Sequence, residues 1–116
     1  WLAKRSDVDA SRLALMGWSH GGSTTLWAVD PRRAKPEAEF KTAIAFYPGC
    51  SVQTKQAGWG TRIPLTILIG AADDWTPAEP CRALRTRANV RYIEYPGAYH
   101  AFDNPNLPLR VLEAIT

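Results

Sequence analysis

The stretch GWSHGG at residues 17–22 decides the fold, because it fits the pattern Gly-x-Ser-x-Gly at a strand-to-helix turn. Residues 12–17 (RLALMG) predict a strand before it, and residues 22–29 (GSTTLWAV) predict a short helix after it, stopped by Asp30 and a proline. On so sharp a turn the serine occupies a strained bend with its hydroxyl exposed, and the flanking glycines let neighbouring backbones approach. We therefore interpret Ser19 as a nucleophile; the alternative is an ordinary turn with a capping serine.

The rest of the chain alternates strand-like and helix-like segments. Strands are predicted at residues 40–47, 64–70 and 90–95, helices at 77–88 and 108–115, and loops at 31–39 and 48–62, with Thr76 as a helix N-cap and Pro77 at the first helical position. Strands alternating with helices imply parallel strands joined by crossovers, so the expected class is α/β. The near-continuous apolar run at residues 65–69 fits a sheet covered on both faces. Functional residues of such a sheet lie beyond the carboxyl ends of its strands.

An acidic candidate follows the strand at residues 64–70. The segment GAADDWTP at residues 70–77 carries two adjacent aspartates, and an acid here can orient and stabilise a catalytic imidazolium. The alternative is a turn before a helix, where aspartate is common as a cap. Both residues cannot fill the catalytic role. We prefer Asp73, three residues after the glycine that ends the strand, and interpret Asp74 as a capping or surface carboxylate.

A base candidate follows the strand at residues 90–95. The chain has two histidines, and the ring of His20 cannot easily turn back onto the adjacent Ser19 hydroxyl. We expect His20 to line the pocket or pack against the turn, with its backbone N–H as one oxyanion donor. His100 is then the candidate general base. The chain order serine, acid, histidine is that of α/β-hydrolases, so this fold is predicted.

Several of these stretches resemble the dienelactone hydrolase family. The resemblance rests on residues 17–22, on residues 70–77 followed by Cys81, and on residues 95–97 with the HAF segment at residues 100–102. It covers nearly the whole chain, and it implies a hydrolase acting on a small-molecule ester or lactone without a cofactor. The founding members use a cysteine nucleophile where this chain has serine. The resemblance is therefore to a serine-nucleophile variant, which retains acyl-transfer chemistry.

The resemblance also implies that the chain is the C-terminal part of its fold. In this family the nucleophile turn follows the fifth strand of an eight-stranded sheet. Residues 1–116 are then expected to form a partial domain of about four parallel strands with flanking helices. The first strands and the loop that supplies the second oxyanion N–H would lie upstream. The edge of the strand before Ser19 would be exposed and hydrophobic.

Two cysteines bear on the compartment. Cys50 and Cys81 follow the second and third predicted strands, at the same edge of the sheet, so they either form one disulfide or remain two buried thiols. A disulfide predicts a periplasmic or secreted protein, whereas free thiols also fit a cytoplasmic one. The chain has no CxxC pair and no His cluster at zinc spacing, so no metal site is expected.

Composition narrows the classes of function. The chain is 46% hydrophobic and 22% charged, as in soluble globular proteins, and its net charge of +3 is scattered, which argues against nucleic-acid binding. No apolar stretch is long enough to span a bilayer. Aromatic residues near the candidate site either line a substrate pocket or pack in the core and surface: Trp18, Trp59, Trp75 and Tyr99. Two other functions stay open, a prolyl-oligopeptidase-like peptidase and an inactive, non-catalytic module. The oligomeric state is not predicted.

Overall fold

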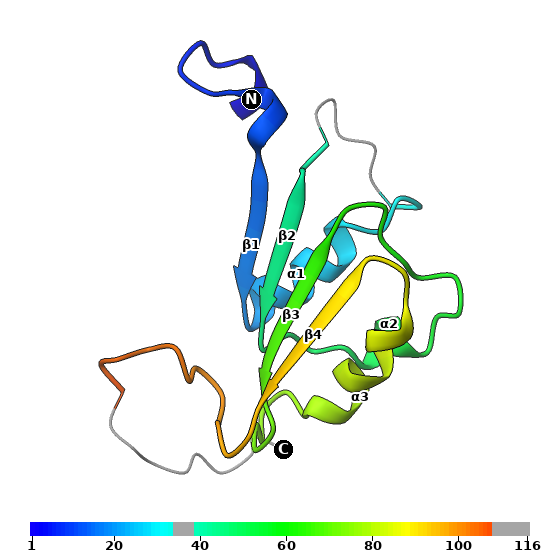
Figure 1. Ribbon diagram of the computed structural model, residues 1–116, viewed down its shortest axis with the longest axis vertical. Coiled ribbons are helices and arrows are strands. Elements are labelled where there is room, and N and C mark those ends of the chain that lie inside the picture. Colours follow the sequence, from blue (N-terminus) through cyan, green and yellow to red (C-terminus); the bar gives the residue numbers. More distant parts are fainter. Residues whose placement is uncertain (34–38, 108–116) are drawn as a thin grey trace.

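The computed structural model describes residues 1–33 and 39–107, and within them four parallel strands form one sheet (Figure 1). The strands lie in the order β1-β2-β3-β4, with bounds Ala14–Trp18, Thr42–Phe46, Leu65–Gly70 and Val90–Tyr95. All three pairings are parallel, as the alternation of strands and helices predicted. The helix predicted at residues 108–115 lies outside the described residues.

The helices differ more from the prediction than the strands do. α1 (His20–Ala28) begins two residues earlier than predicted, directly after Ser19. A short helix, α2 (Ser51–Thr54), lies in the segment predicted as a loop. α3 (Ala78–Ala83) ends five residues early and continues as the 3-10 turn η3 (Leu84–Thr86). Two further 3-10 turns, η1 (Leu2–Lys4) and η2 (Ala10–Arg12), precede β1.

The N-terminus of α3 corrects the predicted cap. Pro77 is the N-cap residue, with an extended backbone, and Thr76 lies one position outside the helix. The Thr76 hydroxyl lies 2.8 Å from Asp73 Oδ2 and makes no cap hydrogen bond. A cap would accept a backbone N–H at the hydroxyl oxygen, whereas this hydroxyl donates to Asp73. The side chain is directed at the carboxylate, because charge-assisted hydrogen bonds are the stronger ones.

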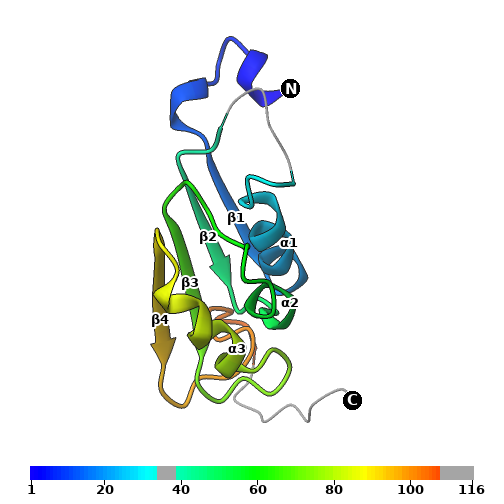
Figure 2. The same ribbon diagram turned by 90° about the vertical axis from the view of Figure 1, so that its right-hand side faces the viewer.

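Within the described residues, α1, α2 and α3 lie on one side of the sheet (Figure 2). The residues of β2 and β3 that face them are buried, as in Ala43, Ala45 and Ile67, each 0% exposed. No helix within residues 1–33 and 39–107 covers the opposite face, so the predicted cover on both faces is not found there. Met16 and Trp18 are exposed on that face of β1, which is an edge strand of the described sheet.

A disulfide joins Cys50, which precedes α2, to Cys81 in α3. Both cysteines are buried, and the interpretation as two free thiols is wrong. Trp59 is also a core residue: it is 2% exposed, and its indole N–H donates to the Leu26 carbonyl oxygen at 2.9 Å. Trp59, one of the four aromatic residues considered for a substrate pocket, therefore packs in the core.

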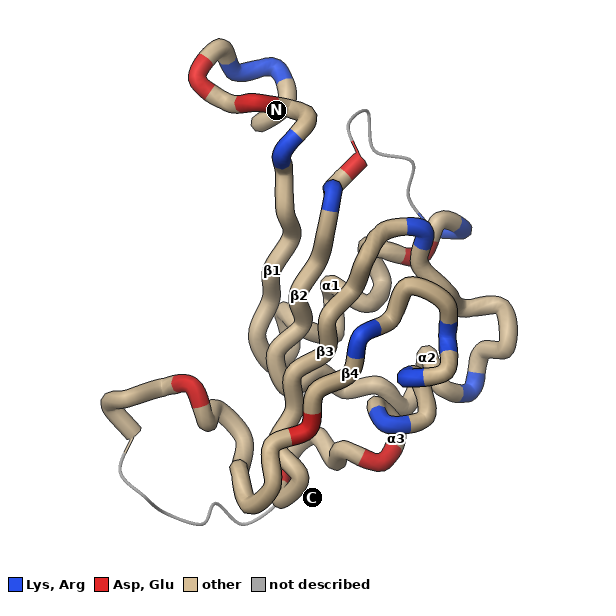
Figure 3. The backbone as a smooth tube through the Cα atoms, viewed as in Figure 1, with Lys and Arg blue, Asp and Glu red and all other residues tan. Residues whose placement is uncertain are grey.

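Charged residues are dispersed along the backbone, with Lys and Arg on several loops and near α3 and β4, and Asp and Glu between them (Figure 3). Among the described residues, no helix has the length and apolar character that a membrane crossing requires. Within residues 1–33 and 39–107, no group of three or more His, Cys, Asp or Glu side chains is placed to hold a metal ion.

Candidate active site

Ser19 sits on a strained turn at the carboxyl end of β1. Its φ is 55° and its ψ −114°, a conformation that a non-glycine residue adopts only where the surrounding structure holds it. The Ser19 N–H donates to the Phe46 carbonyl oxygen at 3.0 Å, which ties the turn to the end of β2. The serine side chain is half-buried at the first turn of α1.

The glycines around Ser19 do not all serve the same purpose. A Cβ on Gly17 would lie 2.1 Å from the Gly21 carbonyl oxygen, so β1 and α1 approach closely only because this residue is glycine. A Cβ on Gly22 would lie 2.7 Å from the Phe46 carbonyl oxygen. A Cβ on Gly21 would meet nothing within 4 Å among the described residues. The close approach on the helix side is therefore made at Gly22, one residue later than the pattern predicted.

Three side chains from three strand ends form a continuous hydrogen-bonded chain. His100 Nε2 lies 2.8 Å from Ser19 Oγ, and His100 Nδ1 lies 2.8 Å from Asp73 Oδ2. Asp73 and His100 are buried, so water competes little for these contacts. The structure thus brings together the serine, acid and histidine that the sequence analysis selected, although Ser19 and His100 are 81 positions apart.

Asp73 is held by a dense set of donors. Its Oδ1 accepts the backbone N–H groups of Trp75 at 2.9 Å and Thr76 at 2.8 Å. Burial alone would raise the pKa of the Asp73 carboxyl, but the hydrogen bonds from His100 and Thr76 outweigh it and hold this pKa below its usual value. Asp73 is therefore a carboxylate at neutral pH, oriented toward the imidazole.

Asp74 occupies a different environment from the one predicted. It is half-buried, and its Oδ1 is enclosed without a hydrogen-bond partner among the described residues, so it is neither a helix cap nor a fully solvated carboxylate. The loop turns Asp73 inward, because both N–H groups that close the turn point at that residue.

Two further residues at the site were missed by sequence reasoning. The Thr76 hydroxyl lies 3.1 Å from His100 Nδ1 and 3.1 Å from the Tyr47 carbonyl oxygen. The Tyr47 ring packs against His100 with a centroid separation of 4.5 Å. A threonine before proline is typical of a helix cap, and the tyrosine lay within the predicted strand at residues 40–47, so neither pattern pointed to the site.

The aromatic residues proposed for a pocket lie in three environments. Trp75 stacks on the His100 ring at 5.3 Å between centroids and is 42% exposed. Trp18 is 44% exposed and stacks on Phe46 with a 5.3 Å centroid separation. Tyr99 is half-buried. The His20 side chain is exposed, and its backbone N–H is the first of α1, a position that has no intrahelical acceptor.

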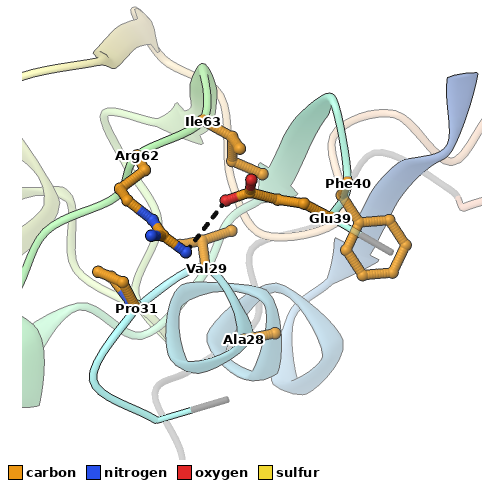
Figure 4. Close-up of a pocket in the computed structure, with 7 residues that line it drawn as sticks. All are labelled: Ala28, Val29, Pro31, Glu39, Phe40, Arg62 and Ile63. Atoms are coloured by element: carbon orange, nitrogen blue, oxygen red, sulfur yellow. Dashed lines mark ion pairs between the residues drawn. The ribbon is translucent and has the colours of Figure 1, made fainter. Parts of the chain in front are cut away.

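Two cavities in the described structure lie elsewhere. One, of about 30 Å³, sits beside the end of α1 and is crossed by an ion pair between Arg62 and Glu39 at 3.3 Å (Figure 4). That volume holds about one water molecule. The other, of about 330 Å³, lies between α2 and α3 and includes Lys55 and Glu79 in its lining. Neither is lined by Ser19, Asp73 or His100.

The chain has a parallel sheet, and a serine in a strained conformation lies between the end of β1 and the start of α1. These features define an α/β-hydrolase fold. Solved structures agree: a thermostable esterase superposes with a TM-score of 0.60 at 27% identity, over 79% of this chain and 24% of that one. Puromycin hydrolase superposes with a TM-score of 0.67 at 20% identity, over 86% of this chain and 20% of that one, which shows the fold alone.

Sequence relationships identify the family. The model of the dienelactone hydrolase family matches residues 1–114, and the chain therefore belongs to that family. It is 36% identical to Cutinase 2 of Thermobifida cellulosilytica, over 95% of this chain and 40% of that protein. Against Cutinase cut1 of Thermobifida fusca the identity is also 36%, over 95% of this chain and 33% of that protein. The chain thus spans well under half the length of these relatives.

Proposed function

We propose that this chain carries the catalytic residues of a serine hydrolase that cleaves carboxylic esters or lactones. The observation that supports this most is the chain of two 2.8 Å contacts from Ser19 through His100 to Asp73, at the carboxyl ends of β1, β3 and β4. A nucleophile, a base and an acid in this order can activate a serine hydroxyl at neutral pH.

The proposed reaction proceeds in two halves. His100 Nε2 accepts the Ser19 proton as Oγ attacks the ester carbonyl, and the imidazolium then protonates the departing alkoxide. Asp73 accepts a hydrogen bond from Nδ1–H and stabilises the positive ring without taking its proton. Water attacks the acyl-enzyme with His100 again as base, and the proton returns to Ser19 as the acid leaves.

The oxyanion needs N–H donors directed at it. We assign one to the His20 backbone N–H, which follows the nucleophile and begins α1. We place the second donor in a loop upstream of residue 1, within a larger domain of which residues 1–116 form the C-terminal part. The coverage of 40% and 33% of the two cutinases supports a larger domain.

The aromatic surroundings favour a small ester with an apolar part as substrate. Trp75 stacks on the His100 ring, Trp18 directly precedes Ser19, and both expose ring surface. Tyr99 precedes the base, so we propose these three as lining of the substrate pocket. The family and the cutinase relatives point to esters rather than to the peptides of a prolyl-oligopeptidase-like enzyme. The buried disulfide supports a periplasmic or secreted location.

A fluorophosphonate probe tests the nucleophile in the intact protein. We expect labelling of Ser19, mapped by mass spectrometry, and its loss in Ser19→Ala and His100→Ala. Ser51→Ala, an exposed serine of α2, should label and hydrolyse p-nitrophenyl esters like the parent. A folded protein that shows neither labelling nor esterase activity would favour the non-catalytic alternative. Faster cleavage of peptide anilides than of esters would favour the peptidase.

A further inference from the structure

Asp103 joins two strand ends of the candidate site through a single carboxylate. Its Oδ2 accepts the Trp18 indole N–H at 2.8 Å, and its Oδ1 accepts the Tyr47 hydroxyl at 2.8 Å. These donors are 85 and 56 positions away in the chain. Trp18 ends β1 and Tyr47 directly follows β2. Asp103, in the loop after β4, therefore connects this loop to the ends of β1 and β2.

Each of the three residues is next to a group of the proposed reaction. Trp18 immediately precedes Ser19, and Asp103 lies three residues after His100. The Tyr47 ring packs on the His100 ring, and its edge meets Phe102 with a centroid separation of 5.6 Å. A carboxylate holding both Trp18 and Tyr47 thus links the backbone that carries the nucleophile to the loop that carries the base.

The backbone around these residues needs such a fastening. Tyr47 has φ 35° and Ala101 has φ 60°, both in the left-handed region that residues with a Cβ rarely adopt. Such conformations persist only where the surroundings over-determine them. Ala101 directly follows His100, so relaxation of its backbone would rotate the imidazole away from Ser19.

The two contacts differ in exposure, and they complement each other. Tyr47 is buried, and burial together with the Asp103 hydrogen bond raises the pKa of its hydroxyl, which stays a donor throughout the neutral range. The Trp18 contact is at the surface. The Tyr47 contact is partly buried, whereas Asp103 itself is exposed. Hydrogen bonds to a charged acceptor are stronger than neutral ones, so the partly buried contact is expected to be the stronger of the two.

We infer that Asp103 is a positioning residue that aligns His100 on Ser19 by holding Trp18 and Tyr47 together. This inference rests on the proposed serine-hydrolase function. Asp103 itself touches neither Ser19 nor the ring nitrogens of His100 in the described contacts, so its effect passes through geometry.

The test compares Asp103→Asn and Asp103→Ala with the parent in the intact protein. We expect kcat for a p-nitrophenyl ester to fall about 10- to 100-fold in Asp103→Ala, with KM changed less than threefold, because about 1 Å of misalignment costs up to a hundredfold in rate. The fluorophosphonate labelling rate should fall in parallel. Asp103→Asn keeps one acceptor oxygen and should lose less.

A matched control lies on the far strand of the sheet. Glu94 accepts the Tyr92 hydroxyl and an Arg82 N–H at 2.8 Å, so it too is a carboxylate that holds a tyrosine. Glu94→Gln should leave kcat and the labelling rate within twofold of the parent. An equal loss of kcat in Glu94→Gln and Asp103→Asn would overturn the inference, because it would mean that any such contact acts through general stability.

A double-mutant cycle separates the effect of the Asp103–Tyr47 hydrogen bond from a direct effect of the Asp103 charge. Tyr47→Phe keeps the ring against His100 and removes only the hydroxyl. We expect it to lower kcat on its own but to change kcat less than twofold in the Asp103→Ala background. Fully multiplicative losses, or a parental kcat in folded Asp103→Ala, would overturn the inference. Retained labelling and activity in Ser19→Ala would instead refute the proposed function, and so the two failures are distinguishable.

Discussion

The two faces of the sheet contrast in what covers them. On the face beneath α1, α2 and α3, the residues of β2 and β3 are buried, as in Ala43, Ala45 and Ile67 (Figure 2). On the opposite face the large apolar residues are only partly buried or exposed, as in Phe46, and Met16 is 47% exposed. Apolar character alone therefore does not locate the core. The packing of helices against one face does, because dispersion contacts require close neighbours.

The largest expected effect of a single substitution falls on the helix-covered face. Ile67→Ala, at the centre of β3, should lower the free energy of unfolding by about 4 kcal/mol, because it removes buried methyl groups and leaves a cavity. Urea denaturation followed by tryptophan fluorescence measures the change. A loss below about 1 kcal/mol would break the comparison between the faces.

The disulfide fastens α3 to the segment that follows β2 on the same side of the molecule. Its two cysteines are 31 positions apart, and a cross-link of that span stabilises by about 3 kcal/mol through the unfolded state. The Cys50→Ala, Cys81→Ala double variant should show that loss in the same denaturation experiment. Adding a thiol reductant to the parent under denaturing conditions should reproduce it, and no difference between the two proteins would contradict the prediction.

Asp30 lies just after the C-terminus of α1, and its carboxylate is buried. Hydrogen bonds from Arg32 hold its pKa below the usual value, despite burial. A lowered folded-state pKa contributes stability above about pH 4, and this stability is lost as pH falls through the folded-state pKa. Asp30→Asn should cost about 2 kcal/mol at pH 7.

Thermal unfolding between pH 7 and pH 3 checks this prediction. The difference in stability between parent and Asp30→Asn should narrow as pH falls, because protonation makes the parent carboxyl resemble the amide. Asp73, whose pKa is also lowered, contributes to the acid loss in both proteins. A difference that is constant over this range would show that the charge of Asp30 does not contribute.

The smallest effect is expected on the open face. Met16→Ala should change the free energy of unfolding by less than about 1 kcal/mol, because the side chain is already partly in water and its removal leaves no enclosed cavity. This variant is the matched contrast to Ile67→Ala. In a longer protein that covers this face, the Met16→Ala loss should rise toward the Ile67→Ala value, which the same denaturation series measures.

Sequence reasoning located the strands well, since each predicted strand overlaps an observed one and β4 coincides at both ends. It missed α2 and predicted α3 to be too long. The last turn of α3 tightens into η3, and Arg87 beyond it donates to the Trp59 carbonyl oxygen at 2.6 Å. Such a contact between distant segments has no local signature.

The candidate site divides in the same way. Ser19, Asp73 and His100 were selected because each follows a strand end, and their separation of 2.8 Å in consecutive contacts is a property of the folded chain. Their catalytic roles remain a prediction until labelling tests them. Thr76 was interpreted as a helix cap and Tyr47 as part of the strand at residues 40–47, so neither was selected as a site residue.

By itself the sequence determined the α/β class, the serine turn and the chain order of the candidate residues, because apolar periodicity and turn chemistry act over a few neighbouring positions. Only the tertiary structure decided which sheet face is packed, which aspartate turns inward and where Asp103 binds. Those outcomes depend on contacts between residues tens of positions apart, where strand pairing and loop closure set the distances. Short-range patterns carry no information about such distances.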